Sequence, residues 1–435
     1  MMEYNSHITA IDLGSSNLVA AVGVMNAEGK LEVKDMVIKP MEGITLGDLA
    51  NIEYVTVALK EALNELGQRN HIEIKEAYIS ISGKDIQCTN NSYFVYVGSD
   101  GEIKNEDLYN LCENMNNVQP PLGKIFLDRF PISYTVDSAE QTKNPVGMFG
   151  RRLGATYNFI VAPQSYIDRL NKALDRVDLK CKKFIPTPMA AAYAVTTEDE
   201  REMGSAVVNI GSGTTDICIW HDNVIKYMAV IPLGSEAINS DIRSTSIPNR
   251  YIEKLKTKHG YASAAAIPED RAKLSIKLPG RTQKESKIIS YYDLSTLIES
   301  RMLQIIGYVM DEIKDSQLGE QLAAGIILTG GGAKLNGVDA LFKEHSGYEV
   351  RLGSIEYDLS EKSVAEIEMP EASTAAGMLF MSFKESNLTT YEEPIIKHIT
   401  DDTPTPSEPK QSWWQKLLNK TLGEESINEN NEQYD

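Results

Sequence analysis

The chain has 435 residues, 42% of them hydrophobic, and a formal net charge of -19. This length exceeds what one hydrophobic core normally serves, so we expect two or more lobes. The negative charge argues against a general nucleic-acid binder, because the phosphate backbone requires a basic surface. The four cysteines are far apart and have no metal-ligand spacing, which favours a reduced cytoplasmic compartment. No run of about 18 apolar residues is present, so we expect no membrane-spanning segment.

In chain order, the pattern first predicts two short apolar strands within His7–Gly23, joined by a tight polar turn. A helix is expected over Asn51–Leu66 and a strand over Ala77–Ser82. Between residues 83 and 161 the pattern changes and indicates a small β-rich insertion. Its expected elements are strands Tyr93–Val97, Phe126–Val136 and Thr156–Val161, with helix Asn105–Asn114.

The second half of the chain contains a strand–turn–strand unit over Ala206–Trp220 that resembles the first hairpin, the nearest feature to an internal repeat. Residues 237–287 are mixed and polar, and ordered patterning stops near Phe383. Helices Tyr166–Val177, Pro188–Val195 and Asp293–Lys314 and strand Gly325–Leu328 are also expected. Residues 384–410 contain four prolines and many polar residues, which predicts a disordered linker.

The first hairpin turn has the residues of a phosphate-binding loop. Gly14 lets the chain turn without a side chain blocking a phosphate, and Ser15, Ser16 and Asn17 can donate hydrogen bonds to phosphate oxygens. Asp12, at the end of the strand, could hold Mg²⁺ through water. The alternative is a plain β-hairpin turn.

The second hairpin repeats this chemistry over Asn209–Asp216, with Gly211 and Gly213 flanking Ser212 and with Thr214 as a second donor. Two such hairpins can hold one phosphate chain from opposite sides. The triplet Gly330–Gly332, expected to open a helix after a strand, leaves room for a base and ribose, or is an ordinary turn. Neither a Walker-type GxxxxGK[ST] nor a GxGxxG after the first strand is present, which argues against P-loop and Rossmann folds.

The order of these turns resembles the actin/Hsp70/sugar-kinase superfamily. The resemblance implies an α/β, actin-like (ribonuclease H-like) two-lobed ATPase fold that binds ATP with Mg²⁺. Glu253 and Lys256 occupy positions matching that superfamily's adenine wall, although a solvated helix face would explain them too. The candidate nucleotide-binding residues are Asp12, Gly14, Ser15, Ser16, Asn17, Asn209, Gly211, Ser212, Gly213, Thr214, Thr215, Glu253, Lys256, Gly330, Gly331, Gly332 and Lys334.

Two strings in the insertion, FLDRFPISYTVD at 126–137 and NPVGMFGRRLGA at 144–155, narrow the resemblance to the FtsA family of actin-like cell-division proteins. It covers roughly residues 5–383 and the terminal helix. The resemblance implies polymerisation into short filaments or minirings, docking of the FtsZ C-terminal peptide at about 236–290, and attachment to the inner face of the cytoplasmic membrane at the division site with other division proteins. An actin-like pilus-assembly scaffold and a small-molecule kinase of the superfamily are the alternatives.

The resemblance also sets the expected domain boundaries. Residues 5–83, 162–200 and 346–383 would form the first lobe, and 84–161 the inserted SHS2-like subdomain. Residues 201–235 and 291–345 would form the second lobe, with 236–290 as its outer part. A linker (384–410), an amphipathic membrane-targeting helix (411–422) and an acidic tail (423–435) would follow.

One position departs from the superfamily. Its second phosphate turn usually starts with Asp, whereas this chain has Asn209, and an amide cannot supply a negative charge to Mg²⁺-bound water. Thr187 stands where related ATPases place a water-orienting Gln or Glu. We therefore expect ATP to be bound but hydrolysed very slowly or not at all.

The segment SWWQKLLNKTLG predicts an in-plane amphipathic anchor, with tryptophans at the membrane interface, leucines below and lysines toward the headgroups. Docking of this helix on the protein's own body or on a partner is the alternative. About three turns bind a membrane weakly, so oligomerisation would add avidity, whereas the acidic tail would weaken attachment. The candidate membrane-binding residues are Trp413, Trp414, Lys416, Leu417, Leu418, Lys420 and Leu422.

Overall fold

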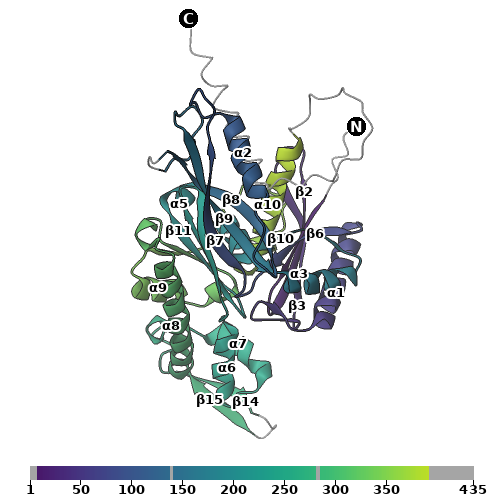
Figure 1. Ribbon diagram of the computed structural model, residues 1–435. Coiled ribbons are helices and arrows are strands. Elements are labelled where there is room, and N and C mark those ends of the chain that lie inside the picture. Colours follow the sequence, from purple (N-terminus) through teal and green to yellow (C-terminus); the bar gives the residue numbers. More distant parts are fainter. Residues whose placement is uncertain (1–6, 138–140, 281–284, 391–435) are drawn as a thin grey trace, which may run out of the picture. The chain divides into compact units, whose positions relative to one another are not determined.

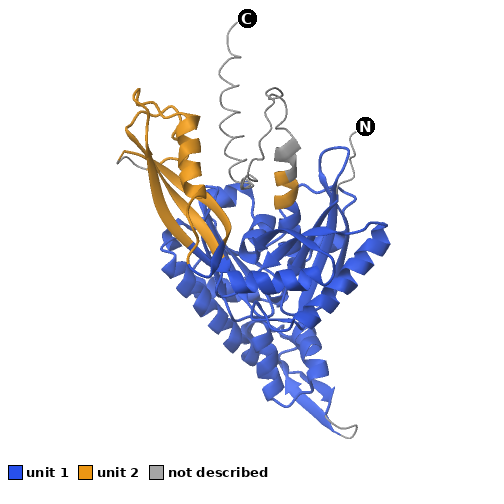
Figure 2. Cartoon of the chain, turned by 45° about the vertical axis from the view of Figure 1, so that its right-hand side comes forward, with its two compact units in different colours: residues 1–88, 122–125, 162–380 blue, residues 89–121, 126–161, 381–435 orange. Residues whose placement is uncertain are grey.

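The computed structural model describes residues 7–137, 141–280 and 285–390, with side chains up to 385. It separates the chain into two compact units (Figure 2). Within the described residues, unit 1 comprises 7–88, 122–125 and 162–380, and unit 2 comprises 89–121, 126–161 and the segment from 381 onward. The expected terminal helix 411–422 and acidic tail 423–435 lie outside the described residues.

The first sheet of unit 1 has the strand order β10-β6-β1-β2-β3 (Figure 1). Its strands β1, β2 and β3 are antiparallel neighbours, whereas β6 and β10 run parallel to β1. The strands span Ile8–Leu13 (β1), Asn17–Met25 (β2), Leu31–Pro40 (β3), Glu76–Ile81 (β6) and Lys180–Pro186 (β10). A two-stranded hairpin, β4 (Ile44–Thr45) and β5 (Asp48–Leu49), follows β3.

The second sheet of unit 1 repeats this order and these directions as β17-β16-β11-β12-β13. The repeat suspected from two hairpins therefore extends over whole sheets. Its strands span Ser205–Ile210 (β11), Thr215–His221 (β12), Val224–Ile231 (β13), Ile326–Thr329 (β16) and Val350–Leu352 (β17).

Helix α1 shows how local sequence defines the elements of unit 1. It spans Ile52–Asn70 and begins where the side chain of Asn51 accepts a hydrogen bond of 2.9 Å from the backbone N–H of Glu53. One stripe of apolar residues with helical spacing, from Val55 to Leu66, is buried. Helix α3 spans Gln164–Asp175, and the short helix α5 spans Glu198–Met203.

Helix α4 (Thr187–Val195) is the element that the two sheets share. All its residues are buried, and it contacts β6 and β10 of the first sheet as well as β11, β12, β13 and β16 of the second. A helix buried on every side must be apolar all round, which explains the sequence TPMAAAYAV. Its alanines keep the helix narrow enough to fit between two layers.

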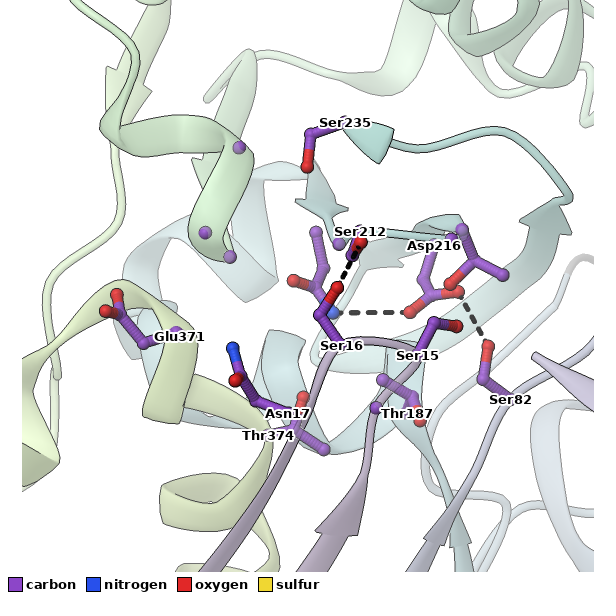
Figure 3. A pocket seen from close by; sticks show the side chains of 18 of the residues that line it. Ser15, Ser16, Asn17, Ser82, Thr187, Ser212, Asp216, Ser235, Glu371 and Thr374 are labelled. Carbon is purple, nitrogen blue, oxygen red and sulfur yellow. Dashed lines mark hydrogen bonds between the residues drawn. The ribbon is translucent and has the colours of Figure 1, made fainter. Parts of the chain in front are cut away.

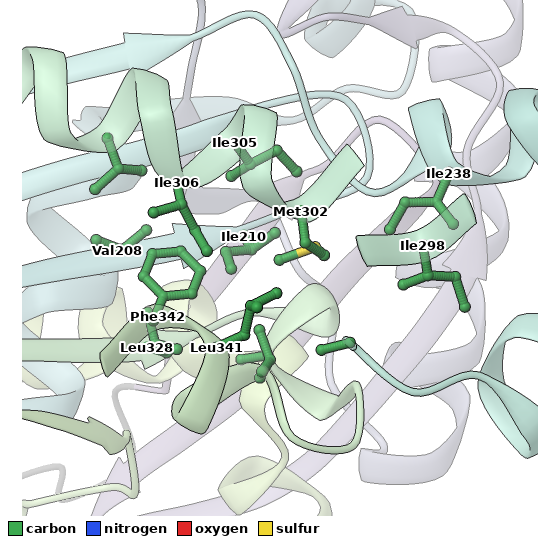
Figure 4. Packing of buried hydrophobic residues seen from close by; sticks show 14 of the residues in the cluster. Val208, Ile210, Ile238, Ile298, Met302, Ile305, Ile306, Leu328, Leu341 and Phe342 are labelled. Carbon is green, nitrogen blue, oxygen red and sulfur yellow. The ribbon is translucent and has the colours of Figure 1, made fainter. Parts of the chain in front are cut away.

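The core of the second half lies between its sheet and helix α8 (Tyr291–Asp315). Figure 4 shows Met302 and Ile305 of α8 near Ile210 of β11, and Ile298 belongs to the same cluster. Helix α9 (Val338–Ser346) adds Leu341 and Phe342 to this cluster.

The polar stretch 237–287 contains more order than the sequence pattern indicated. It forms helices α6 (Glu236–Ser244) and α7 (Asn249–His259) and an antiparallel hairpin, β14 (Ser275–Pro279) and β15 (Ser286–Ser290). The guanidinium of Arg301 on α8 donates to both carboxylate oxygens of Asp241 on α6, at 2.8 and 2.7 Å. Tertiary contacts of this kind supply the order that local pattern does not show.

Unit 2 contains a three-stranded sheet of order β7-β9-β8 and helix α2 (Asn105–Asn116). The strands span Gln87–Tyr96 (β7), Lys124–Val136 (β8) and Arg152–Pro163 (β9). Its core combines Leu108 and Leu111 of α2 with Tyr134, Tyr157 and Phe159 of the sheet. The β-rich character expected of the insertion is thus confirmed.

The last described helix, α10, spans Ser373–Thr390 and continues past the boundary expected at Phe383. No proline or glycine lies between Phe383 and Thr390, so nothing in that stretch interrupts the helix. The start of the predicted linker at Lys384 was therefore wrong. Its remaining part, 391–410, lies outside the described residues. Among those residues, no helix combines the length and apolar composition needed to cross a bilayer.

Candidate nucleotide-binding site

A cavity of about 490 Å³ opens in unit 1 where the three glycine turns meet (Figure 3). Of the predicted nucleotide-binding residues, all except Thr215 line it. The first hairpin contributes Asp12 to Asn17, the second Asn209, Gly211 to Thr214 and Asp216, and the third turn Gly330 to Gly332. Segments almost 200 residues apart in the sequence therefore face one space, as the pairing of the two hairpins predicted.

The two hairpin turns have the same local structure. The backbone N–H of Gly14 donates to the carbonyl of Asn17 at 3.1 Å, and that of Gly211 donates to the carbonyl of Thr214 at 2.9 Å. The turns also touch, because the hydroxyl of Ser16 donates to that of Ser212 at 2.5 Å.

Gly213 is required by this close approach. A Cβ at that position would lie 2.8 Å from the Cβ of Ser15 and 3.1 Å from the backbone nitrogen of Leu46. These contacts are shorter than side-chain carbons tolerate. A glycine therefore lets the second turn pack directly on the first.

The third turn differs from its prediction in one respect. Gly330 has a positive φ of 84°, and the triplet leads into a short 3-10 helix, Gly331–Lys334, rather than an α-helix. The next α-helix, α9, begins only at Val338. A Cβ on Gly330 would meet the Ile210 carbonyl oxygen at 2.7 Å, whereas one on Gly331 would meet nothing within 4 Å. The turn thus packs on β11 at one glycine and is open at the next.

Thr215 does not line the cavity because side chains alternate along β12. Its neighbours Thr214 and Asp216 face the cavity, whereas Thr215 is fully buried and donates its hydroxyl to the carbonyl of Leu233 at 2.8 Å. Its equivalent in the first hairpin by register is Leu18, also fully buried. The residue is a core position of the sheet.

Glu253 and Lys256 lie on α7, and both line the cavity. The Lys256 ammonium lies 2.9 Å from the Glu253 carboxylate, which also accepts from Asn239 at 2.8 Å. Lys256 is 8% exposed, so the interpretation as a solvated helix face was wrong for this residue. Ile238, Met302 and Leu335 add apolar surface to the lining, as a flat base would need.

Lys334 lines the cavity from the 3-10 helix and pairs with the carboxylate of Glu371 at 2.8 Å. Of the lining residues described here, Lys256 and Lys334 are the cationic ones, and each is already paired with a glutamate. A polyphosphate would therefore find hydroxyl and N–H donors but no unpaired cation among these residues. Such a ligand fits only if a divalent cation enters with it.

Asp12 is the predicted contact for that cation. Its carboxylate accepts from the hydroxyl of Ser80 at 2.6 Å, and burial raises its pKa to about 6. In the part of the chain that the structure describes, no group of three His, Cys, Asp or Glu side chains could hold a metal. A Mg²⁺ ion at Asp12 would thus take most of its ligands from water and phosphate oxygens, as Mg²⁺ commonly does in nucleotide sites.

Asp216 is a second buried carboxylate in the cavity, and sequence reasoning did not select it. Burial raises its pKa to about 7 although the hydrogen bond from Ser82 lowers it, and the charge of Asp12 raises it further. A signal was present, because Asp216 lies directly opposite Asn209 in the hairpin register. Thr187, which stands where related ATPases have a water-orienting residue, is the first residue of α4 and also lines this cavity.

Other lining residues had no local signal. They come from loops, helix starts and helix α7, which only the fold brings together. They include Gly47, Ser82, Ser235, Thr257, Glu371 and Thr374. The predicted membrane-binding residues, Trp413, Trp414, Lys416, Leu417, Leu418, Lys420 and Leu422, lie outside the described residues.

Sequence comparisons match two family models: cell division protein FtsA over residues 206–377, and the SHS2 domain inserted in FtsA over 83–161. The cell division protein FtsA of Pseudomonas aeruginosa is 30% identical over 382 residues, covering 87% of this chain and 90% of that protein. That of Escherichia coli strain K12 is 29% identical over 427 residues, covering 96% and 98%.

Solved structures similar to this one include a PilM-PilN type IV pilus biogenesis complex, with a TM-score of 0.57 at 15% identity, covering 86% of this chain and 98% of the matched chain. MreB5 of Spiroplasma citri bound to ADP has a TM-score of 0.54 at 12% identity, covering 90% and 100%. At such identities the likeness concerns the fold alone. It confirms the actin-like fold expected from the three turns.

Proposed function

Because the chain belongs to the FtsA family of cell division proteins, we propose that it binds MgATP, polymerises on the inner face of the cytoplasmic membrane and tethers FtsZ filaments there. The observation that carries the proposal is the similarity to FtsA proteins over nearly the whole chain, insertion included. Its partners would be the FtsZ C-terminal peptide, further copies of this chain, lipid and other division proteins.

The cavity supports the nucleotide part of this proposal. Both glycine turns line the cavity with hydroxyl-bearing residues, Ser15 and Ser16 from the first turn and Ser212 and Thr214 from the second, which suits a phosphate chain. The apolar lining near α7 and α8 suits a base, and the third turn leaves open space at Gly331. The need for an accompanying cation favours MgATP over free ATP, because the two buried carboxylates would repel an uncompensated triphosphate.

ATP cleavage in this cavity is proposed to be slow. Thr187, at the position where related ATPases have a Gln or Glu, is too short to orient the attacking water as those side chains do. Asp216 nevertheless provides a proton acceptor at the phosphate end of the cavity. We expect tight binding with slow turnover, and single-turnover cleavage at kinase-like rates would contradict this.

Vesicle recruitment tests the adaptor function. The purified full chain with MgATP should bring FtsZ to vesicles of phosphatidylglycerol and phosphatidylethanolamine, measured by co-sedimentation. FtsZ lacking its C-terminal peptide should stay in the supernatant. If FtsZ stays unbound while the chain itself binds the vesicles, the tethering function is refuted.

The double change Trp413→Glu and Leu417→Glu tests the predicted anchor. It places two charges on the apolar face of the amphipathic segment, so it should release the chain from vesicles. The matched control is Asn428→Glu with Asn431→Glu, which adds the same charge in the acidic tail. Equal sedimentation of both variants with the unchanged chain would remove the anchor hypothesis.

A further inference from the structure

The carboxylate of Asp216 is held at both oxygens by donors from the two halves of unit 1. Its Oδ1 accepts from the hydroxyl of Ser82, which follows β6, at 3.0 Å. Its Oδ2 accepts from the side-chain amide of Asn209, on β11, at 3.2 Å (Figure 3). The Thr214 hydroxyl also contributes a hydrogen bond. With 2% exposure, this carboxylate has little water to replace a lost partner.

The pairing fixes the orientation of the Asn209 amide. Its nitrogen must face Asp216, because the opposite orientation would place an amide oxygen against a carboxylate oxygen. The amide oxygen then faces Gly330 of the third turn, where a Cβ would collide with it. Asn209 therefore contacts two other parts of the site at once, and each contact uses a different atom of the same amide.

We propose that Asn209 is a positioning residue that holds the carboxylate of Asp216 in the orientation needed for ATP cleavage. The inference rests on the proposed function, since it requires MgATP in the cavity. On this inference, the asparagine at 209, where the superfamily usually has aspartate, favours ATP cleavage instead of hindering it. An aspartate at 209 would face Asp216 with a second negative charge, whereas the amide gives it a hydrogen-bond donor.

The chemistry needs an oriented acceptor. A water oxygen forms a bond to the γ-phosphorus while the bond from that phosphorus to the β,γ-bridging oxygen breaks, and ADP leaves with the electron pair. The proton of the attacking water passes to the Asp216 carboxylate. Each carboxylate oxygen has two lone pairs, so an oxygen that accepts one hydrogen bond can still take this proton. The donors from Ser82 and Asn209 fix which lone pairs remain available.

The experiment uses the full chain and [γ-³²P]ATP with Mg²⁺ under single-turnover conditions between pH 5.5 and 8.5. MgATP dissociation constants are measured separately by equilibrium dialysis. Two variants alter the pairing, Asn209→Ala and Asn209→Asp. The matched control, Asn70→Ala, breaks another amide-to-carboxylate hydrogen bond, the 3.0 Å contact of Asn70 with Asp35, which lies outside the cavity lining.

Loss of the donor in Asn209→Ala should slow cleavage about tenfold, with a change of less than about threefold in MgATP affinity. Asn209→Asp keeps the side-chain size and should also slow cleavage. It should move the rising limb of the pH–rate profile to higher pH, because Asp12 and the new carboxylate would both oppose ionisation of Asp216. The control should match the unchanged chain.

Faster cleavage by Asn209→Asp would overturn the inference, because residue 209 would then act by supplying charge. An unchanged rate and pH profile in this variant would overturn it too. If Asn209→Ala fails to fold, the direction in which Asn209→Asp changes the cleavage rate still tests the inference. Failure of the unchanged chain to bind MgATP would refute the proposed function, whereas binding without any cleavage would refute this inference alone.

Discussion

Replacing Asp216 by asparagine should stabilise the ligand-free protein at neutral pH. Burial raises the pKa of this carboxyl from 3.8 to about 7, so keeping it ionised in the folded state costs free energy. A shift of roughly three pH units corresponds to about 4 kcal/mol at most. Asp216→Asn removes that cost. The Ser82 hydroxyl can reverse its role and accept from the new amide, so we expect about 2–3 kcal/mol of net stabilisation at pH 8.

The direction of the pKa shift determines how the stability difference between Asp216→Asn and the unchanged chain varies with pH. Because the folded state holds this proton more tightly than the unfolded chain, the unchanged protein loses stability as pH rises from about 4 to about 7. The advantage of Asp216→Asn should therefore be small below pH 4 and complete above pH 7. Between pH 5 and pH 8 it should grow by about 2–3 kcal/mol.

Urea unfolding would measure this difference. The buried Trp220 serves as the fluorescent reporter in a chain whose other two tryptophans are replaced by phenylalanine. The exposed Asp270→Asn changes charge by the same amount and is the control. An Asp216→Asn advantage that stays constant between pH 5 and pH 8 would refute the reasoning, as would a variant less stable than the unchanged chain at pH 8.

Two further substitutions follow from the packing. Gly213→Ala should weaken MgATP binding at least tenfold in equilibrium dialysis, because its Cβ would collide with Ser15, while Gly307→Ala, at an open position of α8, should leave binding unchanged. Arg351→Met should lower the free energy of unfolding by about 1–3 kcal/mol, since two guanidinium nitrogens each donate at 2.6 Å to the half-buried Glu200 carboxylate. Urea midpoints equal to those of the unchanged chain would contradict the second prediction.

Features with a local signal were predictable from the sequence. The two hairpins alternate strand, glycine turn and strand within a few residues, and Leu294 to Ile313 on α8 repeat with helical spacing. Asp216 and Glu371 were missed because their roles depend on partners far along the chain. Ser82 is 134 residues from Asp216, and Lys334 is 37 residues from Glu371. Such proximity is decided by sheet order, which local periodicity does not encode.

Helix α4 has a consequence for how this protein can change. The helix is buried between the sheets of both halves, and its first residue, Thr187, reaches the cavity. Its alanines leave no clearance: a methyl group on Gly377 would already overlap the backbone of Ala190. A larger side chain on α4 must displace a sheet, and each sheet carries one of the turns that face the cavity. A substitution that enlarges a side chain on α4 should therefore change the packing between the two sheets and the affinity of the cavity for its ligand at the same time.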